Sequence, residues 1–200
     1  MIRVLLVHDA RLLRSGLAEL LGKARDITAT CTPWRSAERT ARSTRTDVCV
    51  ADVDERNGES RDLTALMRHT SPPGCRLLVL ATAGRPGPLR HAFEADALGF
   101  VNKDASPDQL LTAIRQVAAG ERFVDPSLAL GFLQASQLPL TQRELSVLSL
   151  AAEGASVAEI AASLHLTNGT IRNYMSAITR KTGARNRVDA ICIAQRSGWL

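Results

Sequence analysis

Three charged residues stand where short apolar runs of the chain end. They are Asp9, Asp52 and Lys103. Oxygen ligands suit Mg²⁺ and a lysine can neutralise a phosphate, so the three side chains together could hold Mg²⁺ and a phosphoryl group. Each of them alone is equally explained as a polar residue that closes a strand. The chemistry therefore depends on whether the fold brings them together.

A second set of polar residues lies on a helical pattern near the C-terminus. Arg172, Asn173 and Ser176 share the face opposite Ile171 and Ile178. Arginine can bond guanine through two hydrogen bonds, and asparagine can do the same for adenine. Four bases follow and could neutralise DNA phosphates, namely Arg180, Lys181, Arg185 and Arg187. Periodicity alone also allows a small helical bundle whose polar face is solvated.

The first set needs a sheet that aligns its strand ends. Apolar runs that predict strands cover residues 3–7, 27–31, 47–51, 77–80 and 99–101. Helical patterns lie between them at 12–21, 36–43, 62–69, 89–95 and 108–119. Five βα units in about 120 residues predict an α/β fold, a doubly wound five-stranded parallel sheet with helices on both faces. The carboxyl ends of its strands then form one crevice.

The clearest helix boundaries lie at the end of this region. Ser106 is expected to cap the last helix, with Pro107 at its first position, and Gly120 is expected to close it. Residues 121–137 follow as a linker, in which Asp125-Pro126 could cap a short helix through Leu133, with a loop after it. The predicted domains are therefore 1–120, a linker 121–137, and 138–200.

The second set needs helices, and residues 138–200 provide only helical patterns. Thr141-x-x-Glu144 and Ser156-x-x-Glu159 are two capping boxes that each open an apolar-periodic segment. Thr167 is expected to cap a third helix, from about Thr170 to Lys181, and a fourth follows. Two capped helices and a polar helix after a tight turn predict a small all-α helix-turn-helix domain.

Composition narrows the class of protein. The 200 residues are 45% hydrophobic and 22% charged, which excludes wholesale disorder. The net charge of +5 favours an anionic partner. No apolar run reaches the roughly 18 residues that cross a membrane, and the N-terminal run has no cleavage site, so a cytoplasmic protein without membrane contact is expected. Cys49 and Cys192 lie in apolar periods and are expected to be buried thiols.

The C-terminal segments resemble a known family. The stretches are Leu140-Thr-Gln-Arg-Glu-Leu-Ser-Val-Leu, Ser156-Val-Ala-Glu-Ile-Ala-Ala-Ser-Leu, Gly169-Thr-Ile-Arg-Asn-Tyr and Arg185-Asn-Arg-Val-Asp-Ala. They are similar to the LuxR-type DNA-binding domain over essentially all of residues 138–200. With the βα domain upstream, the whole chain resembles a NarL/FixJ-type response regulator.

This resemblance implies a double-stranded operator DNA partner and a homodimer. The third helix would enter the major groove and contact bases through Arg172, Asn173 and Ser176. Phosphate contacts would fall around Thr167, Thr170, Arg180 and Lys181. The fourth helix, from Asn186 onward, is the family's usual dimerising element.

The N-terminal half is similar to receiver domains. The resemblance implies that Asp52 is the phosphoacceptor, that Lys103 is the pocket lysine and that Phe100 is the aromatic switch residue. Mg²⁺ would be held by Asp9, Asp52 and the backbone carbonyl of Asp54. The phosphoryl group would come from a sensor histidine kinase.

Three positions depart from the receiver pattern. His8 stands where a second acid is usual, and Ala81 replaces a switch hydroxyl, unless a shift of one residue lets Thr82 substitute. The loop Asp54-Glu-Arg-Asn-Gly58 has no proline. Loss of the acid predicts weak Mg²⁺ binding. Loss of the switch hydroxyl removes a charge-assisted hydrogen bond, whose contribution to the free energy is roughly 1.5–3 kcal/mol. Two mechanisms stay open: phosphorylation of Asp52, or control by a small effector in the same crevice or by dimerisation alone.

Two other classes of protein, a phosphatase and a flavin-binding protein, fit the sequence less well. Asp52-Val53-Asp54 is similar to the acid pair of haloacid-dehalogenase-type phosphatases, but Arg56 replaces their hydroxyl residue and no cap domain is visible. A flavodoxin-like flavin site lacks its phosphate loop, because Asp9-Ala10-Arg11 follows the first strand. We therefore expect a DNA-binding regulator that is not an enzyme.

Overall fold

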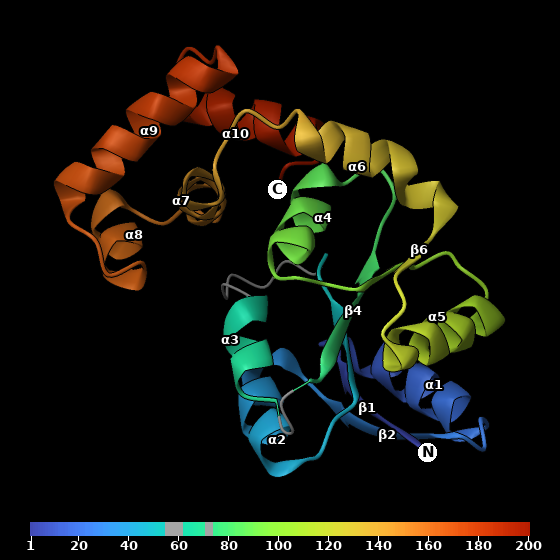
Figure 1. Ribbon diagram of the computed structural model, residues 1–200. Helices are drawn as coiled ribbons and strands as arrows, with labels where there is room; N and C mark the ends of the chain where they lie inside the picture. The colour runs from blue at the N-terminus through green and yellow to red at the C-terminus, as the bar shows by residue number, and fades with distance from the viewer. Residues whose placement is uncertain (55–61, 71–73) are drawn as a thin grey trace. The chain divides into compact units, whose positions relative to one another are not determined.

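The computed structural model describes residues 1–54, 62–70 and 74–200 (Figure 1). The described residues form two compact units. The first contains those up to Ala83 together with Ala92–Leu130, and the second contains Gly84–His91 and Gly131–Leu200.

A six-stranded sheet forms the centre of the first unit. Its strands are β1 (Ile2–Val7), β2 (Ile27–Thr32), β3 (Val48–Asp52), β4 (Arg76–Ala81), β5 (Gly99–Asn102) and β6 (Phe123–Val124). The order is β2-β1-β3-β4-β5-β6, and every pair is parallel. The predicted doubly wound parallel sheet is confirmed, with six strands and not five. The additional strand β6 has two residues, which is too short to show a period-two pattern in the sequence.

Helices cover both faces of this sheet. They are α1 (Arg11–Gly22), α2 (Ala37–Ser43), α3 (Leu63–Arg68) and α5 (Pro107–Ala119), with a short 3-10 turn, η1 (Trp34–Ser36), before α2. Helix α4 (Pro86–Glu94) follows β4 in the chain, and most of its residues belong to the second unit. Helices α1 and α5 lie on one face, and α2 and α3 on the other (Figure 1). Helix α4 begins three residues before the predicted start at 89, because proline fits the first turn of a helix and does not end it there.

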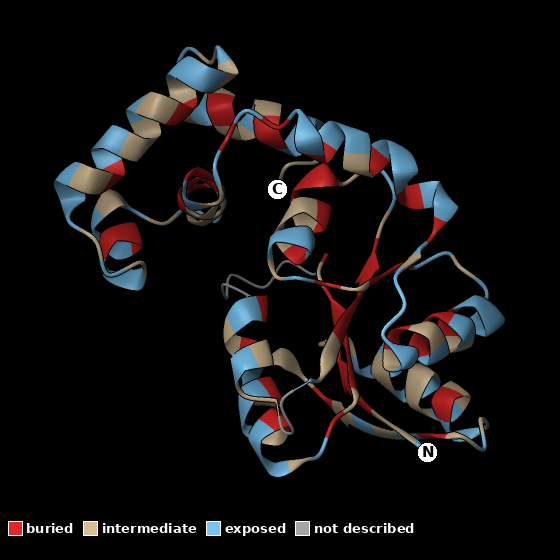
Figure 2. Cartoon of the chain, in the orientation of Figure 1, coloured by how far each residue is buried: buried red, intermediate tan, exposed pale blue. Residues whose placement is uncertain are grey.

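Burial follows the layered arrangement. All five residues of β3 are buried, as expected for a strand covered on both sides (Figure 2). Leu6, Val50 and Leu78 pack in one cluster with residues of α5 such as Ile114. The predicted boundaries of α5 are confirmed. Ser106 accepts a hydrogen bond from the Gln109 N–H in a capping box, and Gly120 closes the helix in the left-handed conformation with φ of 89°.

The rest of the chain is helical. It contains η2 (Pro126–Leu128), α6 (Ala129–Ser136), α7 (Gln142–Ala152), α8 (Val157–Ser163), α9 (Asn168–Thr182) and α10 (Arg187–Arg196). Both predicted capping boxes are present, at Thr141 and Ser156, and Thr167 caps α9. Helix α6 runs to Ser136, three residues beyond the predicted end. A buried cluster that includes Leu145, Ile171 and Ile178 holds α7 to α10 together.

The four cysteines are free thiols. Cys49 is buried, as predicted, and burial raises the pKa of its thiol well above the usual range. The prediction for Cys192 is wrong, since this residue is exposed on α10 together with Val188. Helix α10 therefore has apolar residues on its exposed side as well as on the side that faces the core. None of the helices in the described part of the chain is long and apolar enough to cross a membrane.

Candidate functional site

The first candidate site lies where the strand order of the sheet reverses. Strand β1 has β2 on one side and β3 on the other, so the connections that leave β1 and β3 diverge. Asp9 follows β1, and Asp52 is the last residue of β3. Crevices of this kind are where doubly wound folds bind ligands. Asp52 is fully buried, with 0% of its surface exposed, and Asp54 is buried beside it.

Lys103 reaches this crevice from the end of β5. Its Nζ lies 2.6 Å from Asp52 Oδ1 and 3.4 Å from Asp54 Oδ2. The Asp54 backbone N–H donates a second hydrogen bond, of 2.9 Å, to Asp52 Oδ1. The fold therefore brings together Asp52 and Lys103, as the strand-end pattern predicts. One cation lies between two carboxylates that are almost completely removed from water.

His8 is buried on the other side of Asp52. Its Nε2 lies 3.1 Å from Asp52 Oδ2. The Ala10 backbone N–H donates to its Nδ1 at 3.1 Å, so Nδ1 acts as an acceptor. The proton of a neutral imidazole is then on Nε2, the nitrogen that faces Asp52. Each carboxylate oxygen of Asp52 thus has a nitrogen-bearing side chain close to it.

Trp34 also takes part in the pocket, although no pattern in the sequence marks it as a site residue. Its backbone N–H donates to Asp9 Oδ1 at 2.8 Å, and its indole N–H donates to the Asp52 carbonyl at 3.1 Å. It belongs to η1, after β2, and these contacts span 25 and 18 residues. No local pattern signals contacts of that kind, so only the folded chain shows them.

The remaining pocket positions follow the strand register. Ala81 is the buried last residue of β4, pairs with Asn102, and its carbonyl accepts from the Lys103 N–H at 2.9 Å. Thr82 lies after the strand end and is half-buried. The last position of β4 therefore has no hydroxyl group. Phe100 is fully buried in β5. Most of the proline-free loop, residues 55–58, lies outside the described residues.

The donor set of this pocket fits Mg²⁺ poorly as the side chains lie. Asp9 accepts from Trp34, and Asp52 is paired with Lys103. Among the residues that the structure describes, no group of three or more His, Cys, Asp or Glu side chains is arranged to hold a metal ion. A cation would have to displace existing partners of the two carboxylates.

The second candidate site is the outer face of α9. Ile171 and Ile178 are fully buried, whereas Arg172, Asn173 and Ser176 are exposed. The Ser176 hydroxyl donates to the Arg172 carbonyl at 3.0 Å, and its oxygen can still accept a hydrogen bond. The predicted division of this helix into an apolar and a polar face is thus present in the structure. Its buried face fixes the direction in which the polar face points.

The start of α9 presents two hydroxyl groups. Thr167 Oγ1 accepts from the Thr170 N–H at 3.2 Å, and the two hydroxyl oxygens lie 2.9 Å apart. Thr167 is exposed and Thr170 is half-buried. The N–H groups of a helix N-terminus attract anions, so both predicted phosphate contacts lie where a phosphate would bind well.

The four bases after Ser176 differ in what they contact. Arg180 is exposed and forms no ion pair within the part of the chain that the structure describes. Lys181 Nζ lies 2.8 Å from the buried Glu144 carboxylate, and Arg185 pairs with Asp189 at 3.2 Å. Arg187 donates to the carbonyls of Ala151 and Ala155 at 3.0 and 2.6 Å, at the end of α7. Three of the four bases therefore bond within their own unit.

Glu144 shows the effect of this pairing on ionisation. Burial alone would raise the pKa of its carboxyl, but hydrogen bonds from Lys181 and Thr141 outweigh it. The net pKa is lowered, and the carboxylate stays charged. The Lys181–Glu144 pair thus joins α9 to the start of α7.

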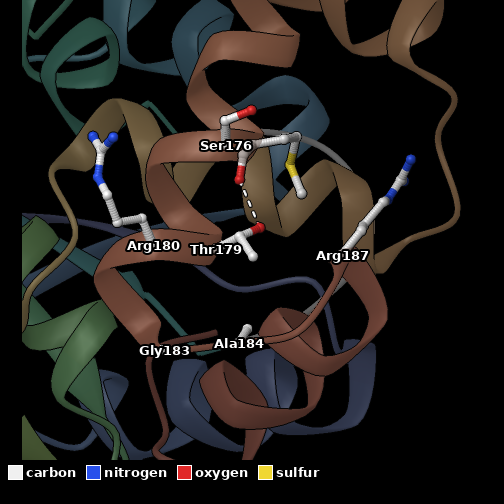
Figure 3. A pocket seen from close by; sticks show the side chains of 7 residues that line it. Ser176, Thr179, Arg180, Gly183, Ala184 and Arg187 are labelled. Atoms are coloured by element: carbon white, nitrogen blue, oxygen red, sulfur yellow. Dashed lines mark hydrogen bonds between the residues drawn. The ribbon is translucent and has the colours of Figure 1, made fainter.

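A hollow of about 570 Å³ adjoins the exposed face of α9 (Figure 3). Arg180 and Arg187 border it on opposite sides, and Ser176 lies at its edge. Its lining residues are Met175, Ser176, Thr179, Arg180, Gly183, Ala184 and Arg187. The hollow continues the polar face toward the turn between α9 and α10.

Comparisons with known proteins identify the family of each part of the chain. Residues 4–115 match the response regulator receiver domain, and residues 138–194 match the luxR family of bacterial regulatory proteins. The chain belongs to the response regulators that carry a LuxR-type DNA-binding domain. It is 48% identical to the response regulator RamR of Streptomyces coelicolor, over 100% of this chain and 98% of that protein.

Further relatives of this response regulator are of the same kind. The transcriptional regulatory protein DesR of Bacillus subtilis is 32% identical over the full length of both chains. The crystal structure of response regulator ChrA, from a heme-sensing two-component system, is 28% identical with a TM-score of 0.57, over 100% of this chain and 98% of that one. Because the relatives are response regulators and transcriptional regulators with a DNA-binding domain, the chain is not an enzyme, and the phosphatase alternative is wrong.

Proposed function

We propose that this response regulator reads operator DNA with α9, whose Arg172, Asn173 and Ser176 contact base edges in the major groove. One observation carries the proposal: these three side chains are exposed on the face opposite the fully buried Ile171 and Ile178. Arginine and asparagine each match the hydrogen-bonding edge of one purine. Because its buried face fixes the orientation of α9, the three side chains already point outward before DNA binds.

The phosphate contacts are proposed for Thr167, Thr170 and Arg180. The two threonines lie at the N-terminal end of α9, where N–H groups favour an anion. Arg180 follows Ser176 by one helical turn, on the same side of the helix. Lys181, Arg185 and Arg187 stay predicted contacts, and their bonds within the unit support smaller contributions to DNA binding.

We also propose that the active species is a homodimer paired through α10. Val188 is 68% exposed on this helix, and Cys192 is exposed one turn later. A second copy would cover these side chains. The operator would then contain two half-sites that match the symmetry of the protein.

DNA binding is tested on the full chain with an operator selected from genomic fragments. Arg172→Ala should weaken binding by about 1–3 kcal/mol, roughly 5- to 150-fold, and relax the preference at one base. The matched control is Arg39→Ala, which removes an exposed arginine of α2. Fluorescence anisotropy at fixed salt measures both variants. If Arg172→Ala binds as the wild type does, α9 does not read the bases as proposed.

For the receiver part we propose domain limits of 1–120, with a linker at 121–137 before the DNA-binding domain at 138–200. We further propose that Mg²⁺ binds its pocket weakly and that phosphorylation of Asp52 is not the principal signal. The contacts of Asp52 with His8 and Lys103, and the absence of a hydroxyl at Ala81, support this. A small effector in the crevice, or dimerisation alone, is then the signal, and a sensor histidine kinase stays a predicted partner.

A phosphoryl donor separates these mechanisms. Acetyl phosphate or phosphoramidate with Mg²⁺ should label Asp52 far below one phosphate per chain and leave the DNA affinity unchanged. Intact-mass spectrometry measures the labelling, and Asp52→Ala gives the background. Stoichiometric labelling together with tighter DNA binding would overturn the proposal and restore phosphorylation as the signal.

A further inference from the structure

The last residue of β5, Asn102, and the next residue, Lys103, are polar, and their side chains make different contacts. Lys103 reaches Asp52, with 2.6 Å between Nζ and Oδ1. Asn102 is 8% exposed, and its Nδ2 donates to Ser127 Oγ at 2.8 Å. A buried amide is costly unless it is hydrogen-bonded. An asparagine at this position therefore needs the partner that the segment after β6 provides.

Asp125 and Ser127 complete a closed network with Asn102. The Ser127 N–H and hydroxyl both donate to Asp125 Oδ1, at 2.9 and 2.7 Å. The Asn102 N–H donates to Asp125 Oδ2 at 3.4 Å. Asn102 Oδ1 accepts from the Asp104 N–H at 3.2 Å, on the far side of Lys103. Hydrogen bonds of the network therefore involve the residues directly before and directly after Lys103 in the sequence.

The carboxylate at the centre of the network is ionised. Asp125 is 5% exposed, and burial alone would raise its pKa. Hydrogen bonds from Ser127 and Asn102 outweigh burial and lower the net pKa. The donors therefore act on a full negative charge, and such hydrogen bonds are stronger than neutral ones.

The network links the end of β5 to the segment of the chain that follows β6. Asp125 directly follows the edge strand β6, its N–H donates to the Phe100 carbonyl at 2.9 Å, and its side chain caps η2. The chain then continues into α6. The strand that precedes the pocket lysine is therefore hydrogen-bonded, through its last residue Asn102, to the segment that leaves the sheet.

We propose that the Asn102–Asp125–Ser127 network couples the state of the Asp52–Lys103 contact to residues 125–128. Asn102 is then a positioning residue for the start of the linker. Any change in the charge on Asp52 that moves Lys103 also moves the end of β5, and the network transmits this shift to Ser127. The inference rests on the proposed function only in taking this pocket as the place where a signal is received, whether or not the signal is a phosphate.

Hydrogen–deuterium exchange on the full chain tests the coupling. The reporters are the protected N–H groups of Asp125, Ser127 and Leu128, and the Leu128 N–H donates to the Asp125 carbonyl at 3.0 Å. Asp52→Asn removes the charge that faces Lys103. It should change exchange in a peptide over residues 123–130 by at least about fivefold, the lower end of usual allosteric coupling.

Two variants break the network without altering Lys103. Asn102→Leu replaces the amide by an apolar side chain. Ser127→Ala removes one hydroxyl at an exposed position. The serine variant keeps the test valid if the asparagine variant fails to fold. In either background the response to Asp52→Asn should fall below about twofold. The matched control is Ser136→Ala, whose hydroxyl donates to the Leu133 carbonyl and to no other group among the residues that the structure describes. It should leave the response intact.

An unchanged peptide 123–130 in Asp52→Asn would overturn the proposal. So would an undiminished response in the Ser127→Ala background. DNA affinity of the same variants is measured in parallel by anisotropy. The coupling can therefore fail while DNA binding persists, and DNA binding can fail while the exchange response persists.

Discussion

The receiver pocket and the outer face of α9 use charge in opposite ways. In the pocket, the fully buried Asp52 lies between Lys103 and His8, each close to one of its carboxylate oxygens. On α9, Arg172 and Arg180 are exposed and form no ion pair with any residue that the structure describes. Buried charge must be compensated within the fold, whereas exposed charge can await a partner.

Two neighbouring bases show the same contrast at the level of single residues. Arg180 faces solvent, and Lys181 lies 2.8 Å from the buried Glu144. A helix turns about 100° per residue, so consecutive side chains point to different surroundings. Basic residues near a DNA-binding helix are therefore not one class, and only some of them are available to phosphates.

The largest effect is expected from removing the cation of the pocket. Lys103→Met leaves Asp52 and Asp54 buried without their lysine, and breaking a buried pair costs about 3–5 kcal/mol. Because the lysine side chain is 27% exposed, we expect the free energy of unfolding of the first unit to fall by about 3 kcal/mol. Urea unfolding, followed by Trp34 fluorescence in a Trp199→Phe background, measures it.

Lys23→Met is the control for this experiment, because Lys23 is exposed at the end of α1. It should change stability by less than about 0.5 kcal/mol. Equal stability of the Lys103 and Lys23 variants would mean that the pocket carboxylates do not depend on the lysine. The contrast between the pocket and α9 would then be wrong.

A smaller effect is expected from restoring the acid that receivers usually have. His8→Asp places another carboxylate next to Asp52 and should tighten Mg²⁺ binding by at least about tenfold, or 1.4 kcal/mol. Trp34 donates to the Asp52 carbonyl, so its fluorescence should report the titration. The same variant should be less stable without the ion, because like charges repel. An unchanged Mg²⁺ affinity would show that His8 is not what weakens binding.

Periodic patterns and helix caps in the sequence predict the helices and strands of both regions. The two capping boxes, the Ser106 cap and the order of βα units all depend on residues near one another in the sequence. The strand ends that carry Asp52 and Lys103 follow from the same patterns. The parallel sheet then brings the two side chains together without further information.

Contacts between distant segments could not be predicted in this way. Trp34 bonds Asp9 across 25 residues, and Lys181 bonds Glu144 across 37. Their residue types fit several roles equally well, and only tertiary packing selects one. Strand β6 cannot be predicted for another reason, since its two residues are too few to show a period.

The salt dependence of DNA binding should separate Arg180 from Lys181. Each phosphate contact contributes about 0.9 to the slope of log affinity against log salt. Arg180→Ala should reduce the slope by about 0.9, and Lys181→Ala by clearly less, because Lys181 is bound to Glu144. Anisotropy titrations at four salt concentrations measure both slopes. Equal reductions would show that the Glu144 pair opens when DNA binds.

The smallest effect is expected for stability at low pH. The comparison is between two glutamates that occupy the same position in their capping boxes. Glu144 is buried beside Lys181, and Glu159 is exposed. Both pKa values are lowered, Glu144 against the effect of burial and Glu159 by hydrogen bonds from Ser156. A lowered folded pKa adds stability above the ordinary value of 4.5, and this stability is lost as pH falls through the folded pKa.

Glu144→Gln should therefore lower the stability of the second unit at pH 7 by about 1 kcal/mol and flatten its decline below pH 4.5. Glu159→Gln should change both less. Trp199 fluorescence in a Trp34→Phe background follows this unit during unfolding, because Trp199 packs against its core. Equal losses in the two variants would mean that the capping box alone sets the effect. Lys181 would then contribute little to the fold and would belong with Arg180 among the bases available to DNA.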